Sequence, residues 1–175
     1  MKKHRITHHH DAIYPNLRTL YDHSFPVYEK RTDAHQLVAL EDNRYHLLCF
    51  LDDNQLIGFF GYWEFTDYLY IEHYAINTDI RGKGYGTQLL KQLLSETNKT
   101  VILEIDPIID EISQKRLRFY QHLGFVENSD SHKHPAYQSQ YEPHSLIVLS
   151  SHHTITPEQY QQFVQDLSTI VMKKA

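Results

Sequence analysis

The apolar residues of this chain follow two spacings, one typical of helices and the other of strands. A helical spacing over 14–24 and a shorter one over 33–40 predict two helices near the N-terminus. Residues 45–51 and 55–64 are apolar and aromatic enough for strands, and the turn-forming residues 52–54 between them predict an antiparallel hairpin. The first third of the chain is therefore expected to supply helices and then a hairpin.

The rest of the chain alternates strands with helices. The predicted elements are a strand over 68–77, a helix over 84–97, a strand over 100–106, a helix over 110–122, a strand from 125, a strand over 146–149 and a helix from 156. A polar stretch over 129–143 shows no periodicity and is expected to be a loop. This order fits an α/β chain with a mixed sheet and helices on both faces.

Composition and charge exclude several classes of protein. The 175 residues are enough for one domain with a sizeable core. A net charge of -5, without a basic stretch interleaved with aromatics, argues against general nucleic-acid binding. No apolar run approaches the roughly 20 residues of a membrane helix, and the polar N-terminus shows no secretory signal. The single cysteine, Cys49, has no intramolecular disulfide partner. We therefore expect a cytoplasmic protein that binds neither nucleic acid nor membrane.

Three of the six glycines gather in the segment Arg81–Gly86, between a predicted strand and a predicted helix. Glycines leave no side chain between backbone N–H groups and a ligand. The first amides of a helix lack partners within the helix, and the helix dipole adds partial positive charge there. The side chains of Arg81 and Lys83 add full charges. The segment therefore favours a phosphate cradle.

Other glycine-rich motifs fit this segment less well. A P-loop needs Ser or Thr directly after its lysine, but Gly84 follows Lys83. A dinucleotide fingerprint needs a third glycine three residues after the second, and Thr87 stands there. A purely structural turn remains the alternative.

The glycine segment and its surroundings resemble the GNAT superfamily of N-acetyltransferases. Arg81, Gly84 and Gly86 match the family signature Arg/Gln-x-x-Gly-x-Gly/Ala. The preceding YLYIEHYAIN resembles the family's fourth strand, and GTQLLKQLL resembles the helix that follows. Downstream, RLRFYQHLGFVE is similar to the second motif, a helix that ends in Phe-Tyr-x-x-x-Gly-Phe. Together these segments cover about 65–127.

The resemblance implies a GNAT-like fold, in which helices flank a central mixed, largely antiparallel sheet. It implies a single domain over 1–175, with a cofactor-binding core at about 65–127 and a C-terminal strand and helix over 145–173. In this family the fourth and fifth strands splay apart, and the pantetheine arm of acetyl-CoA enters the gap. The residues implied to bind acetyl-CoA are Ala75 and Ile76 for the arm, Arg81, Gly82, Lys83, Gly84, Tyr85, Gly86 and Thr87 for the pyrophosphate, and Ser113 as a further hydrogen-bond donor.

Ser113 and Arg116 depart from the family pattern, which often has Asn and Ala at these positions. A serine hydroxyl can still donate a hydrogen bond to the cofactor. The bulkier Arg116 changes the wall of the cofactor site.

The resemblance also implies catalytic residues. Tyr120 matches the tyrosine that donates a proton to the departing thiolate, although it could instead pack on the sheet. Glu72 is the leading candidate for the base, because a carboxylate on a partly apolar strand face can have a raised pKa. Alternation along the strand predicts that Tyr70, Glu72 and Tyr74 share one face and that His73 points to the other. Glu104, Asp106 or ordered water are the alternative bases.

The chain's 14 histidines suggest a metal site, but none forms a ligand motif such as His-Glu-x-x-His. We expect no metal. The histidines of the C-terminal third are expected to be exposed loop residues; they are His132, His134, His144, His152 and His153.

The expected activity is transfer of an acetyl group from acetyl-CoA to a primary amine, by direct attack in a ternary complex. The amine-bearing acceptor is an unidentified small molecule or peptide. Glu29, in the segment Ser24–Arg31 where the family usually binds acceptors, is a candidate contact for a cationic acceptor. The alternative is a non-catalytic CoA-binding or regulatory module. A homodimer through residues 145–173 is left open.

Overall fold

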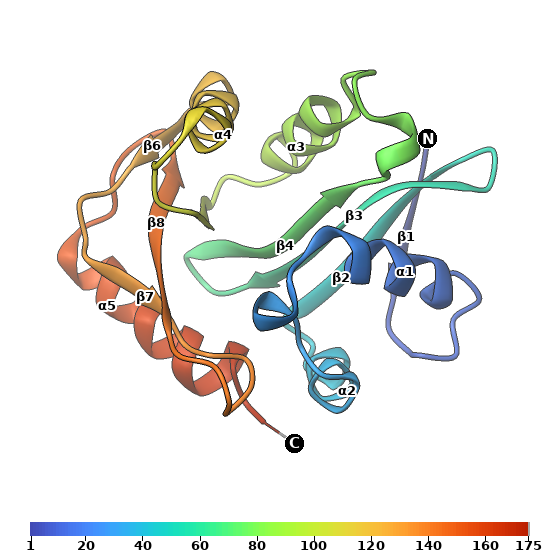
Figure 1. Ribbon diagram of the computed structural model, residues 1–175, viewed down its shortest axis with the longest axis horizontal. Helices are drawn as coiled ribbons and strands as arrows, with labels where there is room; N and C mark the ends of the chain where they lie inside the picture. The colour runs from blue at the N-terminus through green and yellow to red at the C-terminus, as the bar shows by residue number, and fades with distance from the viewer. Residues whose placement is uncertain (175) are drawn as a thin grey trace.

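The computed structural model describes residues 1–174 and contains one eight-stranded sheet with helices around it (Figure 1). The strands are β1 (Lys2–Ile6), β2 (Tyr45–Asp52), β3 (Gln55–Glu64), β4 (Tyr68–Ile76), β5 (Thr100–Ile105), β6 (Phe125–Glu127), β7 (His132–His134) and β8 (His144–Ser151). The helices are α1 (Tyr14–Ser24), α2 (Asp33–Glu41), α3 (Tyr85–Ser95), α4 (Glu111–His122) and α5 (Pro157–Asp166), with short helical turns η1 (Val27–Glu29), η2 (Thr78–Ile80) and η3 (Leu167–Val171).

The sheet is mixed and largely antiparallel, as predicted. Its strand order is β1-β2-β3-β4-β5-β8-β6, and β7 pairs with β8 outside this path. Strands β1 to β4 form an antiparallel meander, and β8 is antiparallel to both β5 and β6. Within the described residues, β4 and β5 are the only strands that pair in parallel. The predicted hairpin over 45–64 is therefore confirmed as β2 and β3.

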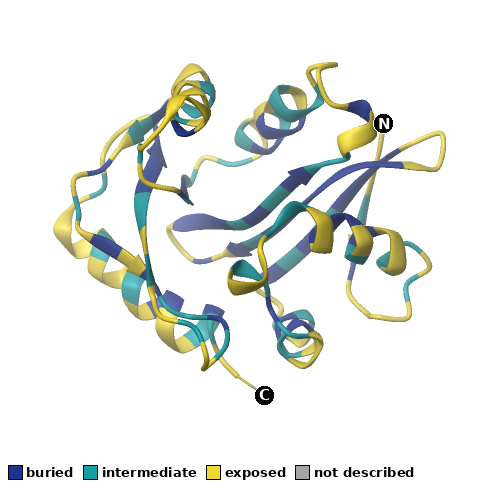
Figure 2. Cartoon of the chain, in the orientation of Figure 1, coloured by how far each residue is buried: buried dark blue, intermediate teal, exposed yellow. Residues whose placement is uncertain are grey.

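Helices cover both faces of the sheet and define two apolar clusters. One face packs against Leu17 of α1, Ala39 of α2 and Phe163 of α5. The other face packs against Leu89 and Leu90 of α3, and partly buried residues of α4 complete that cluster. Figure 2 shows the central strands as mostly buried and the outer sides of the helices as exposed. This arrangement confirms the predicted layers.

Local signals in the sequence explain several boundaries. The Thr156 side chain accepts from the Gln159 amide, and Pro157 fills the first position of α5. Asp110 forms an equivalent capping box with Ser113 at the start of α4. The hairpin turn places Asp53 and Asn54 at positive φ, which these short polar residues tolerate.

The structure contains two strands that the apolar pattern did not predict. Strand β1 carries Lys2, Lys3 and Arg5 and lies at the edge of the sheet, where charged side chains are common. Strand β7 lies inside the stretch expected to be a loop. In this strand His132 and His134 are buried and Lys133 between them is exposed. The inward positions of the strand are therefore polar, so the apolar pattern did not reveal it.

Candidate active site

The glycine-rich segment forms an open cradle at the start of α3. Gly82 and Gly84 have φ values of 86° and 78°, a region that favours glycine. A Cβ atom added at either position would meet nothing within 4 Å, so the backbone there faces open space. No side chain caps the first amides of α3. These amides are therefore available to an anion.

Tyr74 anchors the cradle to the sheet. Its hydroxyl donates to the backbone oxygen of Gly86, and its ring stacks on Phe60 of β3 at 4.6 Å between centroids. A Cβ atom on Gly86 would lie 3.1 Å from that hydroxyl oxygen. The close approach of β4 to α3 thus favours glycine at this position.

Strands β4 and β5 separate after a short parallel pairing. Their paired residues end at Tyr70 of β4 and Ile102 of β5. Ala75 and Ile76 lie beyond this point, where β4 pairs only with β3. Their backbone groups on the β5 side can hydrogen-bond an inserted chain. The splayed strands expected from the family resemblance are present.

A cleft of about 1070 Å³ fills the gap and extends from the glycine cradle to η1. Its lining includes most of the residues expected to bind acetyl-CoA: Ala75, Ile76, Arg81, Gly82, Gly84, Tyr85, Gly86 and Thr87. Lys83 is exposed and does not line it. At the other end the lining includes Tyr28, Glu29, His134 and His144.

Tyr120 lines the middle of the cleft. It lies on α4, packed edge-on against Phe119 and Phe125. Burial raises its pKa to about 12, so the hydroxyl stays protonated at neutral pH. The structure describes no hydrogen-bond partner for this hydroxyl among residues 1–174. The group can therefore donate to a ligand in the cleft.

The structure contradicts the expectation that Ser113 contacts the cofactor. Ser113 is buried, and its hydroxyl donates to Asp110 while it accepts from the backbone N–H groups of Ile109 and Asp110. It does not line the cleft. The serine instead stabilises the start of α4. Arg116 does line the cleft, where its Nη1 lies 2.9 Å from Asp106 Oδ2 at the end of β5.

The strand alternation predicted around Glu72 holds for Tyr70, which lies on the same face as Glu72, and is wrong for His73 and Tyr74. The register between β3 and β4 shifts at Gly61, so that Glu72 has no opposite residue and β4 bulges. Glu72 and His73 consequently lie on the same side, with Nδ1 of His73 3.9 Å from Oε2 of Glu72. Tyr74 points to the opposite face, against α3.

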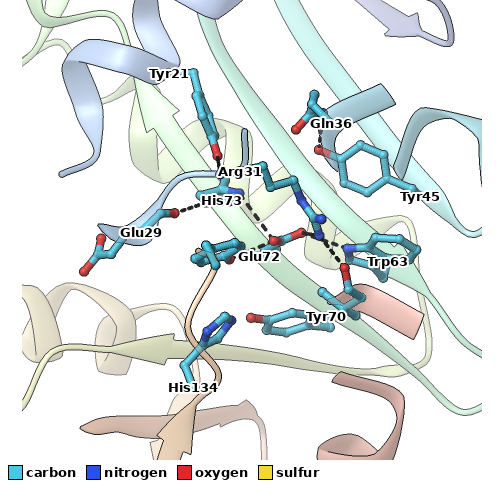
Figure 3. Close-up of polar contacts among 12 residues, drawn as sticks. Tyr21, Glu29, Arg31, Gln36, Tyr45, Trp63, Tyr70, Glu72, His73 and His134 are labelled. Carbon is cyan, nitrogen blue, oxygen red and sulfur yellow. Dashed lines mark hydrogen bonds and ion pairs between the residues drawn. The ribbon is translucent and has the colours of Figure 1, made fainter. Parts of the chain in front are cut away.

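The expectation of a raised pKa for Glu72 is also wrong. Its buried carboxylate accepts from Arg31 Nη2 at 2.8 Å, Trp63 Nε1 at 2.9 Å and Tyr137 Oη at 2.7 Å (Figure 3). Burial alone would raise its pKa, but the adjacent Arg31 guanidinium, the nearby His73 and the hydrogen bond from Trp63 lower it to about 2. A carboxylate held in this way accepts a proton poorly. The geometry therefore does not favour Glu72 as the base.

Comparison with known proteins identifies the family. A family model described as the Acetyltransferase (GNAT) family matches residues 10–125. The chain belongs to this family. Over 112 residues it is 32% identical to the "Putative acetyltransferase YjbC" of Bacillus subtilis, covering 58% of this chain and 52% of the relative. The chain thus spans about half the length of that curated relative.

Two solved structures illustrate the fold of this GNAT family member. A "Putative acetyltransferase from GNAT family" of Bacteroides thetaiotaomicron superimposes with a TM-score of 0.90 and 26% identity, over 98% of each chain. Naa50 of Arabidopsis thaliana, solved with a bisubstrate analogue, matches with a TM-score of 0.62 and 20% identity over 86% of this chain and 97% of its own. The second match shows the fold alone.

Two histidines of this GNAT family member are buried, contrary to expectation. His132 Nε2 lies 2.5 Å from Glu104 Oε2, and its Nδ1 lies 2.8 Å from the Tyr160 hydroxyl. His134 stacks between Tyr137 and His144 beside the cleft. The alternative base Glu104 is thus already paired. The sequence of this strand, His-Lys-His, is polar throughout and gave no signal of the burial.

The part of the chain that the structure describes gives two further results. One trio, His8, His9 and His10, brings potential metal-ligand atoms within 4.8 Å of one another, and all three side chains are exposed. It lies outside the residues that line the cleft. No helix within residues 1–174 has both the length and the apolar character needed to cross a membrane.

Proposed function

We propose that the protein transfers the acetyl group of acetyl-CoA to a primary amine by direct attack in a ternary complex. One observation carries this proposal: a single cleft joins the open cradle of α3, the Tyr120 hydroxyl and the Glu29 end. A donor and an acceptor can therefore meet in the cleft beside a proton donor. Membership of the GNAT family, which uses acetyl-CoA, supports this assignment.

The residues of the cleft fit the chemistry of acetyl-CoA. The uncapped amides from Gly84 to Thr87 suit a pyrophosphate, and Arg81 adds a cation at the rim. The free backbone edge at Ala75 and Ile76 suits the amide groups of a pantetheine arm. The thioester supplies an activated acyl group with a thiolate leaving group. We propose these contacts for this chain, within one domain.

We propose Tyr120 as the proton donor to the departing thiolate. Its raised pKa keeps the phenol protonated, and its hydroxyl has no partner among the described residues that would compete. Proton transfer by a positioned side chain typically contributes about 10²–10⁴-fold to a rate. We assign the buried ion pair of Glu72 and Arg31 a structural role and no part in proton transfer.

Two measurements on the full chain test this function. Calorimetric titration with acetyl-CoA is expected to show binding in a 1:1 ratio. A thiol-release assay with acetyl-CoA and a panel of amines (polyamines, aminoglycosides, amino acids and peptide N-termini) is expected to show turnover with at least one class. Absence of acetyl-CoA binding contradicts the proposal. Binding without thiol release from any amine favours the non-catalytic CoA-binding module.

A further inference from the structure

Four carboxylates line the cleft, and three of them are compensated by a neighbouring group. Glu72 pairs with Arg31, Asp106 pairs with Arg116, and Glu104 is held by His132 and by the Tyr70 hydroxyl. Glu29 is the fourth. Within residues 1–174 its carboxylate has neither a hydrogen-bond donor nor an ion-pair partner. Glu29 is thus the carboxylate of the cleft with which no described residue pairs directly.

The backbone of η1 fixes Glu29 at this place. Nε2 of His73 lies 2.9 Å from the Glu29 backbone oxygen, which can only accept, so that nitrogen carries the proton (Figure 3). Two residues further on, Arg31 donates its backbone N–H to the Tyr21 hydroxyl at 2.7 Å. The carboxylate points away from both contacts in Figure 3. The segment is anchored on one side and presents its acid on the other.

Aromatic rings also line this end of the cleft: Tyr137, His134, His144 and Tyr28 belong to its lining, and Tyr141 lies next to Tyr28 outside it. Their centroids follow one another at 4.9 Å between Tyr137 and His134, 5.3 Å between His134 and His144, 5.8 Å between His144 and Tyr28, and 6.4 Å between Tyr28 and Tyr141. Tyr28 is 42% exposed. We call these five rings the aromatic row. Aromatic faces attract cations within about 6 Å.

We propose that this end of the cleft binds a cationic primary amine, and that Glu29 is the base that takes its proton. The assignment rests on the acetyl-transfer function proposed above and names its acceptor class. The ammonium group is held by the free carboxylate and by the ring of Tyr28, and the uncharged part of the acceptor lies along the aromatic row.

The proton balance follows from these groups. The acceptor enters as R–NH₃⁺, and Glu29 takes one proton to free the nitrogen lone pair. That nitrogen forms a bond to the acyl carbon, the carbon–sulfur bond breaks, and the sulfur leaves with the electron pair. Tyr120 protonates the thiolate and regains a proton from the second N–H of the former ammonium. The products are the amide, the free thiol and one proton, which Glu29 releases to solvent.

The environment of Glu29 suits a base that works near neutral pH. Burial, followed by the negative charge of Asp106, raises its pKa to about 7, and Arg116 partly offsets this effect. Other titratable groups face the same space from neighbouring elements. They are Glu104 and Asp106 from β5, Arg116 from α4, His73 from β4, His134 from β7 and His144 from β8.

Glu29→Gln tests the assignment with benzylamine and spermidine as cationic probes and aniline as a probe that is neutral at pH 7. With the cationic probes, kcat is expected to fall about 10²-fold and to lose its decrease on the acid side of pH 7. With aniline, the rate is expected to change less than about threefold. Glu29→Asp should retain the acid-side decrease at a lower rate. Glu41→Gln, an exposed glutamate of α2, should behave like the wild type.

The other possible results separate the role of Glu29 from the acceptor class and from the proposed function. Unchanged kcat and an unchanged pH profile in Glu29→Gln overturn the role of Glu29 and leave the proposed function intact. Wild-type thiol release with aniline, but with none of the cationic amines of the wider panel, overturns the cationic class and leaves acetyl transfer intact. Acetyl-CoA binding and circular dichroism of Glu29→Gln must match the wild type, which separates a catalytic loss from misfolding.

Discussion

The Nη2 nitrogen of Arg31 lies 2.8 Å from Oε1 of Glu72, although the two residues are 41 positions apart. Both side chains are almost wholly buried. The same nitrogen donates to the backbone oxygen of Val171 at 2.7 Å. The pair therefore ties the segment after η1 and the C-terminal turn η3 to the bulge of β4. The pair is therefore expected to stabilise this part of the cleft wall, and we assign it no part in proton transfer.

Removing one partner of this pair should be costly. Arg31→Met leaves the Glu72 charge buried without compensation and is expected to lower the free energy of unfolding by about 3–5 kcal/mol. The double variant Arg31→Met, Glu72→Gln should recover part of this loss, because no buried charge then remains. Urea denaturation followed by circular dichroism measures both.

The exposed pair of Arg44 and Asp42 provides the control for this experiment, with 2.7 Å between Nη2 and Oδ2. Arg44→Met is expected to change stability by less than about 1 kcal/mol. A cost for Arg31→Met as small as that of the control would contradict the structural role of the buried pair.

Acid should weaken the fold through Glu72. Its folded-state pKa of about 2 lies below its ordinary value of 4.5, so its contribution to stability is present above that ordinary value. This contribution is lost progressively as the pH falls from about 5 toward 2. The difference in unfolding free energy between the wild type and Glu72→Gln should therefore shrink over this range. A difference that stays constant with pH would argue against an ionised, paired Glu72.

Glu29 should show the opposite sign. Its folded-state pKa of about 7 lies above its ordinary value of 4.5, so folding favours its protonated form, and stability is lost as the pH rises from about 4.5 to 7. Glu29→Gln is expected to raise the melting temperature at pH 8 and to change it little at pH 5. Differential scanning calorimetry at the two pH values measures this. An equal shift at both would show that ionisation of Glu29 is not the cause.

The cradle and the end of α4 provide a matched pair of glycines. Gly84 and Gly124 both have positive φ, 78° and 91°, but only Gly84 lines the cleft. Either Gly→Ala change should cost about 1–2 kcal/mol of stability. Gly84→Glu should in addition abolish acetyl-CoA binding, because a carboxylate would occupy the anion cradle. In calorimetric titration, Gly124→Ala should bind acetyl-CoA like the wild type. If Gly124→Ala lost acetyl-CoA binding as fully as Gly84→Glu, the loss in Gly84→Glu would not be specific to the cradle.

Tyr120→Phe should separate catalysis from binding. Loss of the hydroxyl is expected to slow thiol release by about 10²-fold or more while leaving the affinity for acetyl-CoA within about threefold. Tyr62→Phe, on β3 away from the cleft, should leave both values unchanged. Equal rates in Tyr120→Phe and the wild type would place the proton donor elsewhere.

The elements whose signals are local could be predicted from the sequence. Capping at Thr156, the turn at Asp53 and Asn54, and the glycines before α3 each depend on a few neighbouring residues. The spacing of the two motifs along the chain likewise indicated the family and the cradle. These features follow from backbone preference and short-range hydrogen bonding, which a sequence displays directly.

The role of each acid in the cleft depends instead on contacts that form when the chain folds. Glu72 looked like a base on a strand, but its carboxylate pairs with Arg31, whose distant position in the sequence gave no signal. His132 and Asp106 reach their partners through strand pairing and helix packing in the same way. Among residues 1–174, Glu29 has no such partner. The pKa of a carboxylate depends on burial and on charges brought close by folding, and neither can be read from residues nearby in the chain.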